Sequence, residues 1–264
     1  MTGPESQGET LRLAALASRL PEGRGGLLRW PEETDSTNNA LKAWAAQGAP
    51  SGSVFLAEKQ TAGKGRLGRS FLSPPGGLYL SYLLRPPLPP AGVGELTAWA
   101  AVAVRRALRR CCGFWPEIKW VNDLLLEGRK LCGILCESSL RFGTMESLVL
   151  GVGVNVDASE GDFPPELRRT AASLRMFGVT GLDRTLLAAA LIRSLDELAS
   201  DFPGARDAYW EEYRAHCVTL GRKVTLSDGT EGFAEGLEKD FSLRLRLPDG
   251  GTRLLRSGEA TLHR

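Results

Sequence analysis

Short apolar segments, each bounded by glycine, proline or charged residues, recur between residues 27 and 156 of the chain. They are too short for helices and are rich in the aliphatic and aromatic residues that strands favour. The sequence therefore predicts strands at residues 27–30, 54–58, 77–84, 118–121, 124–126, 130–137 and 147–157, with a tight turn at 127–129.

Apolar residues at helical spacing mark further segments. A short helix over residues 11–20 is expected to stop at Pro21, because proline cannot continue a helix. Proline also ends the strand at 77–84, through Pro86, Pro87, Pro89 and Pro90. The remaining helices are predicted directly after residues 35–38, around residues 96–107, and at 182–202 and 205–215.

The helical pattern is absent from Cys217 onward. Short strands alternate there with turns at 227–229 and 248–250, which is typical of a small β-barrel. The chain is therefore expected to have three parts: an N-terminal tail with a short helix at 1–26, a main domain at 27–216 and a small β domain at 217–264.

Composition narrows the class of protein. With 264 residues and 42% hydrophobic content, the chain is long enough for one large core. Its 33 Lys and Arg nearly balance 31 Asp and Glu, so no overall positive field indicates a nucleic-acid partner, and an anion site must be local. The sequence shows no secretory signal and no membrane-spanning run, so we expect no membrane partner. Its five cysteines are odd in number, so we expect reduced thiols in the cytoplasm.

The main candidate for chemistry is the stretch 57–73, AEKQTAGKGRLGRSFLS. Its glycines alternate with Lys64, Arg66 and Arg69, so a permissive backbone and several cations can converge on an anion. The spacing matches neither a Walker A box nor a dinucleotide fingerprint. A solvated basic turn is the alternative for such a run considered alone.

Polar residues inside the apolar strands are a second candidate set, because each must find a partner or face a cavity. They are Lys119, Asn122, Asp123, Lys130 and Asn155. The sequence leaves a buried ion pair open for Asp123, and an ordinary strand-edge role open for Lys130. Gly133 marks a point where another group approaches the strand closely, and Gly151 and Gly153 repeat the pattern. The run DSTN at 35–38 is both a helix N-cap and a place where a ligand can bind.

These motifs together resemble the biotin–protein ligase family. The resemblance rests on DSTN at 35–38, EKQTAGKGRLGRSFLSP at 58–74, KWVNDLLLEGRKLCGILCE at 119–137 and GVGVNV at 151–156. Two positions depart from the family pattern: Lys64 replaces an arginine of GRGRxGR, and Val121 replaces the proline of KWPND. The first change keeps the charge but loses a planar bidentate donor. The second relaxes a turn constraint.

The resemblance implies an α+β protein. Its catalytic domain would have a mixed sheet, similar to class II aminoacyl-tRNA synthetases and lipoate ligases, and a small SH3-like β-barrel would follow it. The implied reaction consumes biotin and ATP, with Mg²⁺, to give biotinyl-5′-AMP. A lysine of the biotin carboxyl carrier protein of acetyl-CoA carboxylase then takes the biotinyl group.

The resemblance also assigns residues to ligands. Lys64, Arg66 and Lys130 would carry catalysis, and Asp123 would lie near Mg²⁺. The biotin site would consist of Ser36, Thr37, Asn38, Gln60, Gly63, Lys64, Gly65, Arg66, Lys130 and Gly133. The ATP site would consist of Arg66, Arg69, Lys119, Asn122, Lys130 and Asn155.

Two other functions remain to be weighed. A lipoate or octanoate ligase or transferase has the same fold, but the glycine-rich loop together with KWVND and RKLCGI favours biotin. A biotin-responsive DNA-binding repressor needs a helix-turn-helix reader, and residues 1–26 offer one predicted helix. We therefore expect the type without an N-terminal DNA-binding domain and no nucleic-acid partner. A homodimer is left open.

Overall fold

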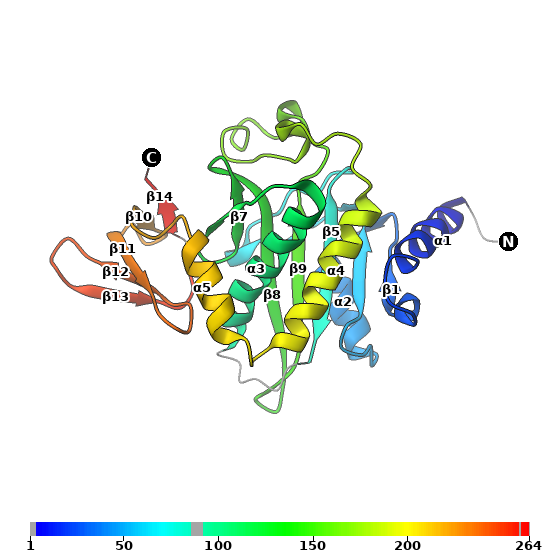
Figure 1. Cartoon of the computed structure of the whole chain (residues 1–264), viewed down its shortest axis with the longest axis horizontal. Coiled ribbons are helices and arrows are strands. Elements are labelled where there is room, and N and C mark those ends of the chain that lie inside the picture. Colours follow the sequence, from blue (N-terminus) through cyan, green and yellow to red (C-terminus); the bar gives the residue numbers. More distant parts are fainter. Residues whose placement is uncertain (1–3, 86–91, 259, 264) are drawn as a thin grey trace.

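The computed structural model describes residues 4–85, 92–258 and 260–263, and its helices and strands form a mixed α+β structure (Figure 1). The α-helices are α1 (Pro4–Ala17), α2 (Thr37–Ala46), α3 (Val93–Cys112), α4 (Arg184–Asp201) and α5 (Arg206–His216). The strands are β1 (Leu28–Arg29), β2 (Glu33–Thr34), β3 (Val54–Ala57), β4 (Lys59–Gln60), β5 (Leu78–Leu84), β6 (Glu117–Lys119), β7 (Asp123–Leu126), β8 (Arg129–Arg141), β9 (Thr144–Val154), β10 (Lys223–Leu226), β11 (Glu231–Leu237), β12 (Leu243–Arg246), β13 (Thr252–Leu255) and β14 (Ala260–Leu262).

A seven-stranded sheet forms the centre, in the order β1-β3-β5-β9-β8-β7-β6. It is mixed, because β1 and β3 run parallel while the other neighbours are antiparallel. Successive side chains of a strand point to opposite faces. Leu148, Leu150 and Val152 of β9 therefore join the large core under α3 and α4, whereas Val149 belongs to a small cluster with Leu41 of α2. Helix α2 thus covers one face of the sheet, and α3 and α4 cover the other.

Most predicted elements are present close to the expected positions, with differences at the two ends of the chain. Helix α1 begins at Pro4 rather than residue 11 and ends at Ala17 rather than residue 20. Proline is well suited to the first turn of a helix, where its missing N–H has no partner to lose. Strand β14 was not predicted, and the first of the short strands expected after Cys217, at 218–220, is a turn. The prolines at 86, 87, 89 and 90 lie outside the described residues.

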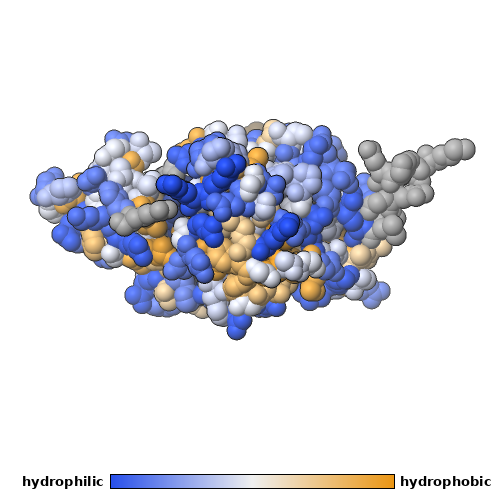
Figure 2. Space-filling view, turned by 90° about the horizontal axis from the view of Figure 1, so that it is seen from above, coloured by the Kyte–Doolittle hydropathy of each residue, from blue (hydrophilic) through white to orange (hydrophobic). Residues whose placement is uncertain are grey.

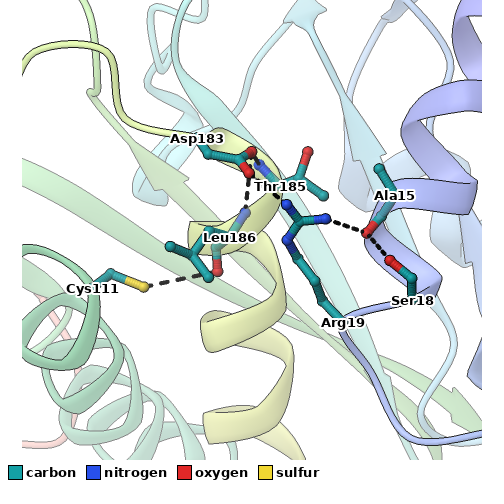
Figure 3. Close-up of polar contacts among 7 residues, drawn as sticks. All are labelled: Ala15, Ser18, Arg19, Cys111, Asp183, Thr185 and Leu186. Atoms are coloured by element: carbon teal, nitrogen blue, oxygen red, sulfur yellow. Dashed lines mark hydrogen bonds and ion pairs between the residues drawn. The ribbon is translucent and has the colours of Figure 1, made fainter.

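Helix α1 is tied to α4 through Arg19 (Figure 3). The guanidinium donates to Asp183 Oδ2 at 2.8 Å and to the Ala15 carbonyl at 2.8 Å. Asp183 also caps α4 by accepting from the backbone N–H groups of Thr185 and Leu186. The Asp183 carboxylate therefore caps the N-terminus of α4 and, through Arg19, holds α1 beside it.

The C-terminal strands form a five-stranded antiparallel sheet in the order β13-β12-β11-β10-β14. Its buried residues belong to the same hydrophobic core as the central sheet. Trp120 donates its indole N–H to the Phe241 carbonyl at 2.9 Å, and Trp210 donates to the Glu238 carbonyl at 2.7 Å. These contacts fix the small sheet at one end of the molecule, opposite α1 (Figure 1).

The surface seen from above is mainly hydrophilic, with an apolar area near its middle (Figure 2). Among the described helices, none combines the length and the apolar character that crossing a membrane requires.

Candidate active site

A floor of three glycines lies on the α2 face of the central sheet. Gly133 of β8 pairs with Gly153 of β9, and Gly151 lies two residues before Gly153 on the same face. A Cβ atom at Gly153 would lie 2.5 Å from the Phe71 ring, and one at Gly151 would lie 2.3 Å from Asn38 Oδ1. A Cβ at Gly133 would lie 3.0 Å from the Phe71 ring and 3.1 Å from Lys130 Cε. The close approach expected at Gly133 is therefore observed, and the missing side chains leave space for a pocket.

The N-terminus of α2 forms the polar wall of this pocket. Ser36 is the N-cap residue, but its side chain makes no capping hydrogen bond within the described part of the chain. Gln60 takes that place, because its Oε1 accepts from the Thr37 backbone N–H at 2.8 Å. Gln60 Nε2 donates to Ser73 Oγ at 2.8 Å, so both ends of the amide are held. The wall thus presents hydroxyl groups at a helix N-terminus, and each hydroxyl can donate to a ligand or accept from it.

The glycine-rich loop forms the cationic side of the pocket and closes on itself as a tight hairpin. Gly65 N–H donates to the Arg69 carbonyl at 2.7 Å, and Phe71 N–H donates to the Gly63 carbonyl at 2.8 Å. Left-handed backbone occurs at Leu67 (φ 55°) and Gly68 (φ 74°). Gly63 is needed for another reason: a Cβ there would lie 2.3 Å from the Phe71 carbonyl.

Lys64 and Arg66 extend from this hairpin in different directions. Lys64 Nζ donates to Asn39 Oδ1 at 2.5 Å. Asn39 in turn donates to Asp35 at 2.6 Å, and this bond, assisted by the charge of Lys64, lowers the pKa of Asp35. Arg66 Nη1 donates to Asn122 Oδ1 at 3.2 Å and to the Gly258 carbonyl at 3.1 Å. The loop is therefore connected both to the turn after β6 and to the C-terminal part of the chain.

Lys130 and Asp123 form an ion pair across β7 and β8, with Nζ 2.7 Å from Oδ1. The ion pair that the sequence left open for Asp123 is thus present, and Lys130 is its partner. The same ammonium lies 5.8 Å from the centre of the Phe71 ring, at the mouth of the pocket. Asn122 holds the neighbouring turn, because its Nδ2 donates to the Ile134 carbonyl at 2.8 Å.

Most of the predicted site residues meet at this place. The pocket is lined by ten of them: Ser36, Thr37, Asn38, Gln60, Lys64, Gly65, Arg66, Asn122, Lys130 and Gly133. A neighbouring cavity on the other side of Arg66 adds Arg69, Lys119 and Asp123. Gly63 packs behind the pocket against Phe71 and Ser73. Asn155 lines neither cavity, and its Nδ2 donates to the Ala172 carbonyl at 2.9 Å. The assignment of each residue to a ligand stays a prediction.

Sequence reasoning missed Phe71 as a lining residue, and it marked Gly151 and Gly153 as points of close approach without assigning them to the site. The two glycines carried a readable signal, since they lie two apart and therefore on one face of a strand. Phe71 carried none, because an aromatic residue beside a basic loop is as common in a core as in a pocket. The Phe71 ring lies over Gly133 and Gly153 and forms an edge contact with Tyr79, 6.4 Å between ring centres.

The cavity beside Phe71 has a volume of about 50 Å³. That is room for one or two water molecules, each of which occupies roughly 30 Å³ in the liquid. A bicyclic organic ligand therefore enters only when Phe71 or the loop moves away.

The residues do not by themselves fit a resident metal ion. In the part of the chain that the structure describes, no group of three or more His, Cys, Asp or Glu side chains could hold one. Asp123, the expected neighbour of Mg²⁺, is engaged by Lys130. An Mg²⁺ ion would have to be held mainly by phosphate oxygens and water, as is common at nucleotide sites. The placement of Asp123 near it stays a prediction.

The sequence of the chain is similar to those of known proteins. Residues 30–155 match the biotin/lipoate A/B protein ligase family. The biotin–[acetyl-CoA-carboxylase] ligase of Mycobacterium tuberculosis is 34% identical over 239 residues, which cover 88% of this chain and 86% of that protein. The chain belongs to the biotin–protein ligase family. A bifunctional ligase/repressor of Bacillus spizizenii is 33% identical over 86% of this chain and 71% of its own length.

Solved structures of the family have the same fold. The biotin protein ligase of Aquifex aeolicus, in complex with biotin and ATP, superposes with a TM-score of 0.76 at 28% identity. The match covers 90% of this chain and 98% of that one. The expected α+β fold, with its mixed central sheet and a small C-terminal β part, is therefore confirmed.

Proposed function

We propose that this chain is an ATP-dependent biotin–[acetyl-CoA-carboxylase] ligase. The observation that carries the proposal is the convergence of three features on the glycine floor: the hydroxyl-rich N-terminus of α2, the cationic hairpin and Lys130. Biotin is complementary to this pocket, since it has a polar ureido ring at one end, an apolar body and a carboxylate at the other end. Relatives bearing this ligase name support the proposal.

In the first step, a biotin carboxylate oxygen attacks the α-phosphorus of ATP and displaces pyrophosphate. Two anions must approach each other, so the site must reduce their repulsion and stabilise the charge that develops at phosphorus. Lys64, Arg66 and Lys130 line the pocket and supply positive charge at the cationic side. Holding the two reactants in line contributes a large share of the acceleration, worth ~7–11 kcal/mol in favourable cases.

In the second step, the amine of a carrier lysine attacks the acyl carbon and AMP leaves. The Phe71 ring and the hairpin cover the pocket, so they would shield the mixed anhydride from water until the carrier arrives. We take the acceptor to be the carrier subunit of acetyl-CoA carboxylase.

Mg²⁺ enters the proposal only as the ion that accompanies ATP. The cytoplasm is the proposed compartment, because all five cysteines are free thiols.

Pyrophosphate exchange tests the first step and its specificity. We expect exchange of labelled pyrophosphate into ATP with biotin and only background exchange with lipoate or octanoate. Exchange that depends on lipoate instead would contradict the proposal and favour a lipoate ligase of the same fold.

A further inference from the structure

Glu137 of β8 lies beside the pocket without lining it, and its two carboxylate oxygens have different partners. Oε1 accepts from the ammonium of Lys42 on α2, and Oε2 accepts from Asn38 Nδ2 at 2.7 Å. The side chains of Glu137 and Lys42 are 24% and 29% exposed, so the pair is partly shielded from solvent. Burial alone would raise the pKa of Glu137, but the bonds from Lys42 and Asn38 lower it, so the group is a carboxylate at neutral pH.

The carboxylate fixes the orientation of the Asn38 side-chain amide. An amide has one donor end and one acceptor end, whereas a carboxylate can only accept. Nδ2 must therefore face Glu137, and it also lies 3.3 Å from the Leu135 carbonyl. Oδ1 then faces Ser81, whose hydroxyl donates to it at 2.6 Å. Asn38 is buried against Gly151, so it has no room to satisfy these groups elsewhere.

This orientation determines which hydrogen-bonding group Thr37 presents to the pocket. The Ser81 hydroxyl also lies 2.8 Å from Thr37 Oγ1, but it has one proton, and Asn38 Oδ1 takes it. The Thr37 hydroxyl can then place its own proton on either of two protein acceptors, Ser81 Oγ or Gln60 Oε1, which is 3.1 Å away. A lone pair of Thr37 Oγ1 therefore remains for a ligand N–H.

We propose that Glu137 is a positioning residue for biotin and acts through Asn38 and Ser81 to keep Thr37 an acceptor for a ureido N–H. This inference rests on the proposed ligase function. If the Asn38 amide turned over, its NH₂ would donate to Ser81, and Ser81 would donate to Thr37. Of its two protein acceptors, Thr37 would then keep only Gln60 Oε1, which already accepts from the Thr37 backbone N–H, so the hydroxyl proton would turn into the pocket more readily and oppose the ureido N–H.

Glu137→Gln separates this polarity from size and shape. The glutamine amide has one acceptor oxygen for the two donors that the carboxylate served. The charged Lys42 takes that oxygen, and the glutamine NH₂ then opposes Asn38 Nδ2. This clash of two donors favours turning the Asn38 amide over, against the one remaining bond to the Leu135 carbonyl. We expect biotin to bind about tenfold more weakly, the effect of one mismatched hydrogen-bonding group.

The double variant Lys42→Met/Glu137→Gln is the decisive comparison. Without Lys42, the glutamine oxygen is free to face Asn38 Nδ2, so the native orientation and most of the affinity should return. A merely structural role predicts the opposite, since the second substitution would add to the damage of the first. Glu212→Gln is the matched control, because Glu212 is 23% exposed and pairs with Arg105 and Arg106 away from the pocket.

The measurement is the biotin Kd of each protein by titration calorimetry, together with the Kd of an analogue carrying N–CH₃ in place of a ureido N–H. We expect Glu137→Gln to reduce the preference for biotin over this analogue about tenfold, the double variant to restore it and Glu212→Gln to leave it unchanged. Equal preference in all proteins, or no recovery in the double variant, would overturn the positioning role alone. Absence of biotin binding by the unsubstituted chain would overturn the proposed function itself.

A further variant keeps the proposal testable if Glu137→Gln does not fold. Lys42→Met leaves both Glu137 oxygens available, so Asn38 keeps its acceptor. We expect this protein to retain the biotin affinity of the unsubstituted chain within about twofold. A tenfold loss would show that the ion pair, rather than the orientation of Asn38, is what matters.

Discussion

Lys130 is the residue whose charge the proposed chemistry needs most. Its ammonium is at the mouth of the pocket, 2.7 Å from Asp123, and its side chain is 36% exposed. A side chain in this position contributes little to core packing, but a cation beside a developing phosphorane or acyl phosphate is difficult to replace.

Lys130→Ala should therefore lower the rate of biotin-dependent pyrophosphate exchange by at least about 100-fold, a typical loss when one stabilising group is removed from a transition state. Thermal unfolding followed by circular dichroism should be nearly unchanged. Lys59→Ala is the matched control, because Lys59 also forms a partly exposed ion pair, with Glu33. Near-normal exchange in the Lys130 variant would refute the role.

Arg66 should distinguish the intermediate from biotin. Its guanidinium lies between Asn122 and Gly258, at the wall shared by the two cavities. Charge-assisted bonds from arginine suit phosphate, so Arg66→Ala should shorten the retention of biotinyl-5′-AMP about tenfold or more while changing the Kd of biotin less. Filter retention of the adenylate and calorimetry of biotin provide the two values. Equal losses for both ligands would contradict a phosphate-facing role.

At this level the sequence identified polar residues more readily than apolar ones. Lys130, Asn122 and Asp123 could be found because polar residues in apolar strands need partners. Phe71 could not, since an aromatic residue is at home in any core. The roles of Ser81 and Glu137 depend on which groups face each other across α2, β5 and β8, and spacing along the chain does not reveal such contacts.

Among the elements, the glycine-rich hairpin is the segment most suited to movement. The backbone bonds of Gly65 and Phe71 stay within the hairpin, and Leu67 and Leu72 are exposed, so its links to the rest of the chain are mainly polar side-chain bonds such as those of Lys64 and Arg66. The cavity beneath the hairpin is too small for biotin. The clustered cations of the hairpin also repel one another until an anion binds.

Hydrogen exchange across residues 61–71 should therefore be fast in the free protein, slower with biotin and slowest with biotin plus ATP. The amides of Thr61, Ala62, Gly65 and Phe71 donate to backbone carbonyls at 2.7–2.9 Å, so they should be the slowest of the segment before ligand is added. Strong protection of all these amides without ligand would show that the hairpin is a preformed phosphate site rather than a lid.

The boundaries of the elements follow from local chemistry where a turn or a proline marks them. The turn at 127–129 and the strands around it could be predicted because a glycine lies between two apolar runs. In the structure, Glu127 and Gly128 adopt left-handed backbone at this turn. Helix α1 could not be placed well, since its first residues are polar and its position depends on contacts such as Arg19 with Asp183. Strand β14 is three residues long and exists through its pairing with β10.

The whole molecule should behave as one cooperative unit with a characteristic loss of stability at alkaline pH. One hydrophobic core joins the central and C-terminal sheets, and the chain has four tyrosines, Tyr79, Tyr82, Tyr209 and Tyr213. Burial raises the pKa of all four phenols above the usual value near 10. The folded state therefore keeps the protons that the unfolded state loses as the pH rises through 10.

Stability should then be full below about pH 9 and fall above pH 10, because ionisation favours the unfolded chain. Tyrosinate absorbance should appear abruptly, together with the loss of the circular dichroism signal. A gradual tyrosinate titration near pH 10 in a still-folded protein would contradict the burial of these phenols.

The central claim is that the pocket over the glycine floor activates biotin for transfer to a carrier lysine. Its most direct test is intact-mass analysis of an apo carrier domain after incubation with ATP, biotin and either the unsubstituted chain or the Gly153→Val variant. A valine there would occupy the space of the Phe71 ring, whose nearest atom is 2.5 Å from the position of a Cβ. We predict one biotinyl group on the carrier with the unsubstituted chain and almost none with the variant. Equal biotinylation by both proteins, or none by the unsubstituted chain, would contradict the claim.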